Sequence, residues 1–220
     1  MNQQKPIKVA MADDHVLLRH ALAALIDQSG TCQVILQASN GIELCQNLKT
    51  ETLPDIVILD MNMPEMDGRE TAIWLQANFP QVRVLMLTMY DSELALIRLL
   101  QAGVKGFMKK DIHPKELLHA LHSVMESGYY YSAHTSSKLA GLFRESLENS
   151  LTLQKVTLSD EEVHFLKLVC TEMTYKEIAH EMKLNPRAID GIRDILFTRL
   201  DVKSRIGLAM YAIRHGLVTF

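Results

Sequence analysis

The side chains best suited to chemistry stand at the ends of apolar runs in the first half of the chain. Asp13 and Asp14 come after "IKVAM", Asp60 ends "IVILD", Thr88 ends "RVLMLT", and Lys110 comes after "GFM". Carboxylates that crowd together repel one another, so a cation must share their site. Oxygen ligands at this density suit Mg²⁺, which takes one or two carboxylates and keeps several waters. With a hydroxyl and an ammonium beside that cation, the site can hold three phosphoryl oxygens.

Alternating apolar runs and amphipathic segments must position these side chains. We expect strands at 7–11, 32–38, 56–60, 83–88 and 106–108, and helices at 15–28, from 41 onward, and at 69–78, 92–101 and 114–126. Such alternation predicts a parallel sheet covered on both faces. Ligand sites in these sheets gather at the carboxyl ends of the strands. The sequence therefore predicts a five-stranded, doubly wound α/β domain in which Asp60 attacks a phosphoryl donor and forms an aspartyl phosphate.

The second half of the chain has a different pattern. Residues 128–155 are rich in Ser, Tyr and small residues, and we expect a linker with a short helix there. After the linker the apolar periodicity is helical only, and "LSDEE" and "TYKE" have the spacing of capping boxes. Two short helices joined by a three-residue turn inside a four-helix unit are typical of a helix-turn-helix. We therefore expect an all-α domain over residues 156–220.

The first half resembles the receiver domain of a two-component response regulator. Over residues 7–127, "DDH", "LDMNMPEMDG", "T" and "KGFMKKD" occur in the order typical of that family. The resemblance places the receiver domain within residues 1–127 and implies that Asp60 is the phosphoacceptor. It also implies that Asp13, Asp14 and the backbone carbonyl of Asn62 help Asp60 to hold Mg²⁺.

The same resemblance implies a phosphate-dependent switch. Thr88 is then the switching hydroxyl, Lys110 rather than Lys109 is the family's lysine, and Phe107 is an aromatic residue that changes rotamer. Phosphorylation adds about −1.5 to −2 of charge. We expect this charge to draw Thr88 and Lys110 inward, to let Phe107 bury, and to alter the face around the fourth helix.

The second half resembles the NarL/FixJ (LuxR-type) helix-turn-helix domain, through "LSDEE", "YKEIAHEM" and "LDVKSRIGLAMYAIRHGLV". In this family the second helix of the motif enters the major groove, and here that helix is about 186–200. On a helical wheel, one apolar face of this helix is expected to point inward, and it consists of Ile189, Ile192, Leu196 and Leu200. Outward-facing Asp190 and Asp194 depart from the family's basic or polar residues, although Asp can accept a hydrogen bond from cytosine. The candidate DNA contacts are Lys176, Arg187, Asp190, Gly191, Arg193, Asp194, Thr198, Lys203 and Arg205.

The composition is compatible with a globular response regulator and excludes some other classes of protein. Hydrophobic residues make up 48% and charged residues 22% of the chain, which excludes wholesale disorder. No apolar run approaches the roughly 18 residues of a membrane span. Three cysteines without a C-x-x-C pair indicate reduced cytosolic thiols, and we expect the nine scattered histidines to be surface or packing residues. Residues 151–220 carry 10 basic and 9 acidic groups, a weak charge footprint for DNA binding.

Together these features predict a cytoplasmic response-regulator transcription factor without a membrane segment. Phosphorylation of Asp60, by a partner histidine kinase or a small acyl phosphate and with Mg²⁺, would control its sequence-specific binding to double-stranded DNA. We expect a homodimer when it is phosphorylated. One alternative is a signalling adaptor whose helix-turn-helix makes protein contacts. Another is a phosphatase of the haloacid-dehalogenase type, but such enzymes need a second aspartate where this chain has Asn62. We therefore do not expect a turnover enzyme.

Overall fold

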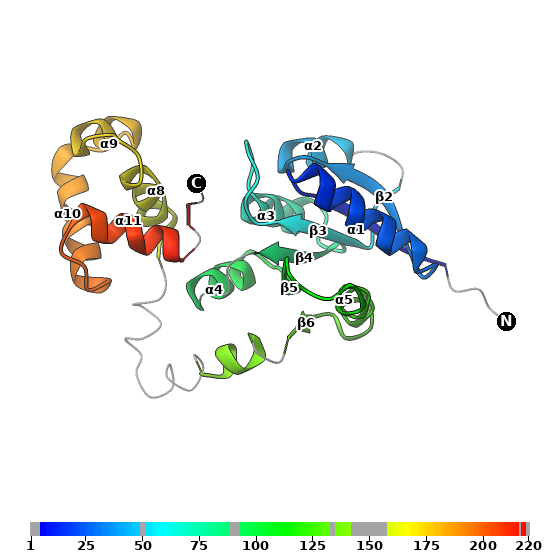
Figure 1. Cartoon of the computed structure of the whole chain (residues 1–220). Coiled ribbons are helices and arrows are strands. Elements are labelled where there is room, and N and C mark those ends of the chain that lie inside the picture. Colours follow the sequence, from blue (N-terminus) through cyan, green and yellow to red (C-terminus); the bar gives the residue numbers. More distant parts are fainter. Residues whose placement is uncertain are drawn as a thin grey trace. The chain divides into compact units, whose positions relative to one another are not determined.

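The computed structural model describes residues 5–48, 52–88, 93–132, 135–141, 158–215 and 217–218, with only the backbone of Glu93 and Leu94. The chain forms two compact units, the first mainly of residues up to 137 and the second mainly of residues from 138 onward. Figure 1 shows the elements of each unit in chain order. Within the described residues, no helix has both the length and the apolar character needed to cross a membrane.

The first unit is a parallel sheet with helices between its strands. Its strands are β1 (Ile7–Ala12), β2 (Cys32–Ala38), β3 (Ile56–Asp60), β4 (Arg83–Thr88), β5 (Gly106–Lys109) and β6 (Tyr130–Tyr131). The helices that alternate with these strands along the chain are α1 (Val16–Gln28), α2 (Gly41–Asn47), α3 (Gly68–Asn78), α4 (Glu93–Gln101) and α5 (Pro114–Ser127). The strands follow the order β2-β1-β3-β4-β5-β6, and every neighbouring pair is parallel. The expected parallel α/β fold is confirmed, but the expected number of five strands is wrong.

The additional strand, β6, lies in the segment that we expected to be a linker. Tyr130 pairs with Gly106, and Tyr131 pairs with Phe107. Gly106 makes this close approach possible, because a Cβ at Gly106 would lie 2.6 Å from the carbonyl oxygen of Tyr130. A strand of two residues is too short to show a period of two in the sequence. The sheet therefore continues past residue 127, where we expected the receiver domain to end.

Both faces of the sheet are buried, which explains the uninterrupted apolar runs of the strands. On one face, Ile58 of β3 packs in a cluster with Ile26 of α1 and Leu121 of α5. Val57 and Leu59 point to the opposite face because side chains alternate along a strand, and they are also fully buried. Helix α2 packs against β1 and β2, and α3 packs against β3. The dry core extends to the last residues of the strands, where the candidate site begins.

The second unit contains four described helices, which are α8 (Asp160–Val169), α9 (Tyr175–Glu181), α10 (Pro186–Arg199) and α11 (Arg205–Arg214). Both predicted capping boxes are present, from Ser159 with Glu162 and from Thr174 with Glu177. The apolar faces of all four helices meet in one core that includes Phe165, Ile178, Leu196 and Leu208. Residues 135–141 form the short helix expected in the linker. Linker residues 133–134 and 142–155 and the first two residues of the expected helical domain, 156–157, lie outside the described part of the chain.

The turn between α9 and α10 comprises residues 182–185, one residue more than the three we expected. Lys183 lies in the left-handed region with φ of 54°, and its N–H donates to the carbonyl of His180. Asn185 then accepts a hydrogen bond from the N–H of Ala188, and Pro186 occupies the first turn of α10. A tight turn of this kind sets α10 directly after α9, as the helix-turn-helix motif requires.

Candidate functional site

Asp13 and Asp60 come together because β1 and β3 are neighbours in the sheet. Ala12 is paired with Leu59, so the residue after each stands at the same carboxyl edge. Asp13 is 1% exposed and Asp60 is 2% exposed. Burial raises the pKa of the Asp60 carboxyl above its usual range, and the charge of Asp13 adds to this rise. Hydrogen bonds from Lys110 and from the backbone N–H of Asn62 oppose the rise in pKa without cancelling it.

The loop after Asp60 is held against the strand end by Gly68. A Cβ at this position would lie 2.1 Å from the carbonyl oxygen of Asp60, so only glycine allows the approach. The N–H of Gly68 donates to the carbonyl of Met61 at 3.0 Å. Asp67 and Glu70 then form a capping box that starts α3. The "DG" of the quoted motif thus closes the loop beside the carboxylate.

Lys110 lies between the two buried carboxylates. Its Nζ is 2.9 Å from Asp60 Oδ2 and 3.0 Å from Asp13 Oδ2, and the side chain is 9% exposed. Burial works to lower the pKa of the Lys110 ammonium, but its bonds to Asp60 and Asp13 and their charges together raise that pKa above its usual range. Lys110 is therefore charged and acts as a counter-ion for both carboxylates.

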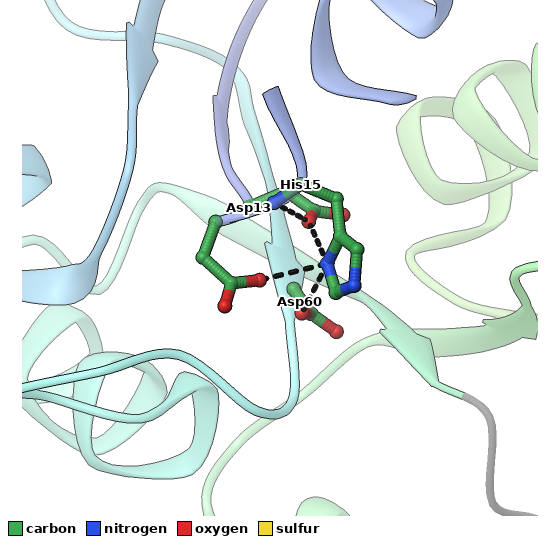
Figure 2. A group of neighbouring side chains, drawn as sticks. Asp13, His15 and Asp60 are labelled. Atoms are coloured by element: carbon green, nitrogen blue, oxygen red, sulfur yellow. Dashed lines mark hydrogen bonds and ion pairs between the residues drawn. The ribbon is translucent and has the colours of Figure 1, made fainter. Parts of the chain in front are cut away.

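His15 is a member of the site that sequence reasoning missed. Its Nδ1 lies 2.7 Å from Asp14 Oδ1, 3.0 Å from Asp13 Oδ1 and 4.0 Å from Asp60 Oδ2. Figure 2 shows the imidazole directed at the carboxylates of Asp13 and Asp60. The only signal in the sequence was its position directly after the acidic pair, in "DDH". His15 is exposed, as expected of a surface histidine, but its Nδ1 also contacts the acidic cluster.

The donor atoms of this cluster fit a divalent cation. One atom from each of Asp13, Asp14, His15 and Asp60 lies within 4.8 Å of the others. The buried Oδ2 atoms of Asp13 and Asp60 accept no hydrogen bond of regular geometry within the described chain, and pair with Lys110. Three carboxylates against one ammonium leave a negative site, which suits Mg²⁺. The carbonyl of Asn62 as a fourth ligand stays a prediction.

Thr88 and Phe107 lie beside this site. Thr88 ends β4, which is next to β3, and it is 3% exposed. Its carbonyl accepts a hydrogen bond from the N–H of Lys110, which fixes the start of the segment that carries the ammonium. Phe107 is 2% exposed, and its ring centroid lies 5.0 Å from that of Tyr131. The Phe107 side chain is therefore already buried in this structure, whereas we expected it to become buried on phosphorylation.

Helix α10 has the inward and outward faces that the helical wheel predicted. Ile189 and Leu196 are fully buried, and Ile192 and Leu200 pack against the same core. Seven of the nine candidate DNA contacts are exposed, namely Lys176, Arg187, Asp190, Gly191, Asp194, Thr198 and Lys203. Ile195 is 56% exposed on this helix, and sequence reasoning did not single it out.

Arg193 is bound to the two aspartates that we expected to face outward, Asp190 and Asp194. Its Nη1 is 2.7 Å from Asp190 Oδ1, and its Nη2 is 2.8 Å from Asp194 Oδ1. The hydrogen bond to Asp194 holds the pKa of the guanidinium above its usual range. The guanidinium also lies 5.4 Å from the ring centroid of Tyr175. One positive charge thus offsets part of the acidic face of α10.

Arg205 is engaged by the backbone of its own unit. Its Nε donates to the carbonyl of Val169 at 3.2 Å, and its Nη2 donates to the carbonyl of Thr171 at 2.7 Å. Val169 is the last residue of α8 and Thr171 lies two residues beyond it, and backbone acceptors at the end of a helix have no partner within it. The contacts give Arg205 a structural role at the end of α8, and its expected contact with DNA stays a prediction.

Comparisons with known proteins agree with this geometry. Residues 9–122 match the response regulator receiver domain family. Response regulator GacA of Pseudomonas aeruginosa is 29% identical over 212 residues, which cover 96% of this chain and 98% of GacA. Oxygen regulatory protein NreC of Staphylococcus epidermidis is 27% identical over 220 residues, 97% of this chain and 100% of NreC.

A solved structure extends the likeness to the fold of nearly the whole chain. RcsB from Salmonella enterica serovar Typhimurium, bound to promoter rprA with the phosphomimetic BeF₃⁻, gives a TM-score of 0.69 at 22% identity. That comparison covers 94% of this chain and 98% of RcsB. The receiver match includes every strand that carries the Asp60 site. The chain therefore belongs to the response regulator receiver domain family.

Proposed function

We propose that this response regulator is a transcription factor whose binding to double-stranded DNA is controlled by phosphorylation of Asp60. The observation that carries the proposal is the buried Asp60 carboxylate, paired with the Lys110 ammonium and surrounded by further acidic donors. A partner histidine kinase or a small acyl phosphate supplies the phosphoryl group. In this proposal the receiver domain extends through β6 to residue 131, the linker follows it, and residues 156–220 form the DNA-binding domain.

The reaction at Asp60 is a phosphoryl transfer to a carboxylate. An oxygen of Asp60 attacks phosphorus, the bond from phosphorus to the leaving group breaks, and an aspartyl phosphate forms. Asp13, Asp14 and Asp60 would hold Mg²⁺, which supplies neutralising charge for the phosphoryl oxygens. The Lys110 ammonium, which already contacts Asp60 and Asp13, pairs with a phosphoryl oxygen. The Thr88 hydroxyl can donate a hydrogen bond to another oxygen.

The modified site has to rearrange because it gains negative charge. Phosphorylation adds about −1.5 to −2 to a place where acidic groups already outnumber ammonium groups. Lys110 therefore moves toward the phosphoryl group and away from Asp13. Its backbone N–H is bonded to the carbonyl of Thr88, so the movement of Lys110 is passed to the end of β4. We propose that Thr88 and Phe107 carry this change to the surface around α4 and favour a homodimer.

The outward face of α10 is the proposed reader of DNA sequence. Because Arg193 binds Asp190 and Asp194, these aspartates repel phosphates less than two free carboxylates would. The exposed side chain of Ile195 can make apolar contact with a thymine methyl group. Lys176, Arg187 and Lys203 are exposed and available to phosphates, whose contacts position a protein without specifying sequence. RcsB, which shares the fold, has been solved on promoter DNA, and this supports the proposal.

The test selects bound sequences from random duplexes, with and without acetyl phosphate and Mg²⁺. We expect enrichment of a preferred site, tighter binding after phosphorylation, and loss of the response in Asp60→Asn. Two-fold symmetric half-sites one helical turn apart are expected for a dimer. Equal recovery of all sequences in every condition would contradict the proposal.

A signalling adaptor is the second candidate, because the acidic groups on α10 give a weak footprint for DNA. It predicts normal labelling of Asp60 together with duplex binding that is undetectable or insensitive to salt. DNA binding by a phosphate-contacting protein weakens steeply as salt rises. A salt titration of duplex affinity therefore separates the two candidates.

A further inference from the structure

The imidazole of His15 occupies a position that neither the phosphoacceptor role of Asp60 nor the DNA-binding role explains. Its Nδ1 is the atom on which Asp13 and Asp14 converge, at 3.0 and 2.7 Å. Helix α1 begins at the next residue, yet the His15 side chain makes no capping hydrogen bond to it. The side chain is also 65% exposed, so packing does not hold the ring there. Its contacts with the acidic cluster are what orient it.

The Nδ1 atom of His15 lies close enough to the carboxylates of Asp13, Asp14 and Asp60 to bind the same metal ion as they do. Carboxylate oxygens only accept hydrogen bonds, so an Nδ1 that carries a proton donates to Asp13 Oδ1. The Lys110 Nζ lies 3.5 Å from the same Nδ1. A neutral imidazole with its proton on Nε2 would instead turn the Nδ1 lone pair toward the same oxygens. A cation shared by those carboxylates would then take the place of the proton and be bound by nitrogen as well as oxygen.

We propose that His15 is an additional ligand of the divalent cation at the Asp60 site, and that it shifts the preference of this site from Mg²⁺ toward borderline ions such as Ni²⁺. The inference rests on the proposed function, because it uses the same carboxylates. Imidazole suits Ni²⁺ and similar transition ions, whereas Mg²⁺ prefers oxygen ligands. Removing His15 should therefore weaken binding of Ni²⁺ while leaving binding of Mg²⁺ nearly unchanged.

The test measures binding of Ni²⁺ and of Mg²⁺ to the full chain by equilibrium dialysis, on protein without a polyhistidine tag or a phosphoryl donor. We expect His15→Ala to weaken Ni²⁺ binding at this site by about tenfold or more. Removing even a residue that only hydrogen-bonds to a metal ligand typically lowers metal affinity by ~10–100-fold. Mg²⁺ affinity should change by less than about twofold, because Mg²⁺ keeps its oxygen ligands. His15→Asn, which places a favoured N-cap residue before α1, should behave in the same way.

His20→Ala is the matched control, because His20 is an exposed histidine of the same helix outside the cluster. It should leave the affinity for both ions unchanged. In an Asp13→Asn background, His15→Ala should cost little further Ni²⁺ affinity, because the two residues share one ion. Far-ultraviolet circular dichroism verifies that each variant is folded.

Two results would overturn the inference. Equal loss of Mg²⁺ and Ni²⁺ affinity in His15→Ala would mean that the ring acts only by ordering the carboxylates. No loss of either would mean that it binds no ion. Labelling of Asp60 by acetyl phosphate with Mg²⁺ separates this failure from failure of the proposed function, since labelling of the unaltered chain does not need the nitrogen ligand.

Discussion

Replacing Lys110 by methionine tests whether the acidic site depends on its internal counter-ion. The variant keeps an unbranched side chain out to the ε position and removes the ammonium that lies 2.9 Å from Asp60 Oδ2 and 3.0 Å from Asp13 Oδ2. At an effective dielectric constant of about 20, each contact has a gross Coulomb energy of about −6 kcal/mol. Desolvation of the ammonium offsets much of this attraction, and breaking a buried ion pair usually costs about 3–5 kcal/mol. We expect the free energy of unfolding of the α/β unit to fall by about 3–5 kcal/mol without metal.

The assay follows urea unfolding by the fluorescence of Trp74, the one tryptophan of the chain, which lies in α3 of the α/β unit. A bound cation can replace the lost charge, so Mg²⁺ should restore more stability to Lys110→Met than it adds to the unaltered protein. Lys109→Met is the matched control, because Lys109 is the exposed neighbour in the sequence. The reasoning would be refuted if Lys110→Met were as stable as Lys109→Met without metal, or if Mg²⁺ stabilised the two variants equally.

Three further predictions concern the helical unit. Asp190→Asn with Asp194→Asn frees Arg193 for a phosphate, so nonspecific duplex affinity should rise and the slope of log affinity against log salt should steepen by about 0.9, measured by fluorescence anisotropy. Arg205→Met leaves two carbonyls after α8 without their donor, and the free energy of unfolding of this unit should fall by about 1–3 kcal/mol in denaturant titrations followed by circular dichroism. Burial, and then the charge of Arg214, lower the pKa of His215, whose Nδ1 is buried without a hydrogen bond among the described groups. Because the folded pKa is below the unfolded one, stability should be lost as the pH falls from about 6.5, and His215→Gln should reduce that loss.

Each of these predictions has its own control. Arg187→Gln should flatten the salt slope if Arg187 contacts a phosphate, opposite to the effect of the aspartate changes. Lys203→Met removes an exposed cation near Arg205 in the sequence and should leave unfolding unchanged. Equal pH dependence of unfolding in His215→Gln and the unaltered chain would show that another group titrates.

The sequence predicted the strands well where burial on both faces makes the apolar pattern continuous. The bounds expected for β2, β3 and β4 agree with the structure, because each run ends abruptly at a polar or small residue. The expected meeting of Asp13 and Asp60 follows from the same rule, since it needs only that β1 and β3 are neighbours. Strand β6 escaped notice because its pairing depends on Gly106, which lies far from it in the sequence.

The contacts of individual side chains were harder to predict from the sequence than the helices and strands. His15 follows two acidic residues without the spacing by three or four that marks ligands on a helix, and only the folded backbone shows that its Nδ1 meets Asp13 and Asp14. Arg205 was expected to contact DNA, but its guanidinium reaches Val169 and Thr171, more than thirty positions earlier in the chain. Such choices depend on distances between elements, which local periodicity does not contain.

Strand β6 also determines where the tether to the second unit begins. Because Tyr130 and Tyr131 are held by main-chain pairing to Gly106 and Phe107, the tether starts inside the sheet rather than at a free loop. Strand β5, which pairs with β6, ends at Lys109, and the next residue is Lys110, whose ammonium contacts Asp60. The hydrogen bonds between β5 and β6 therefore connect the start of the linker to the strand that directly precedes Lys110.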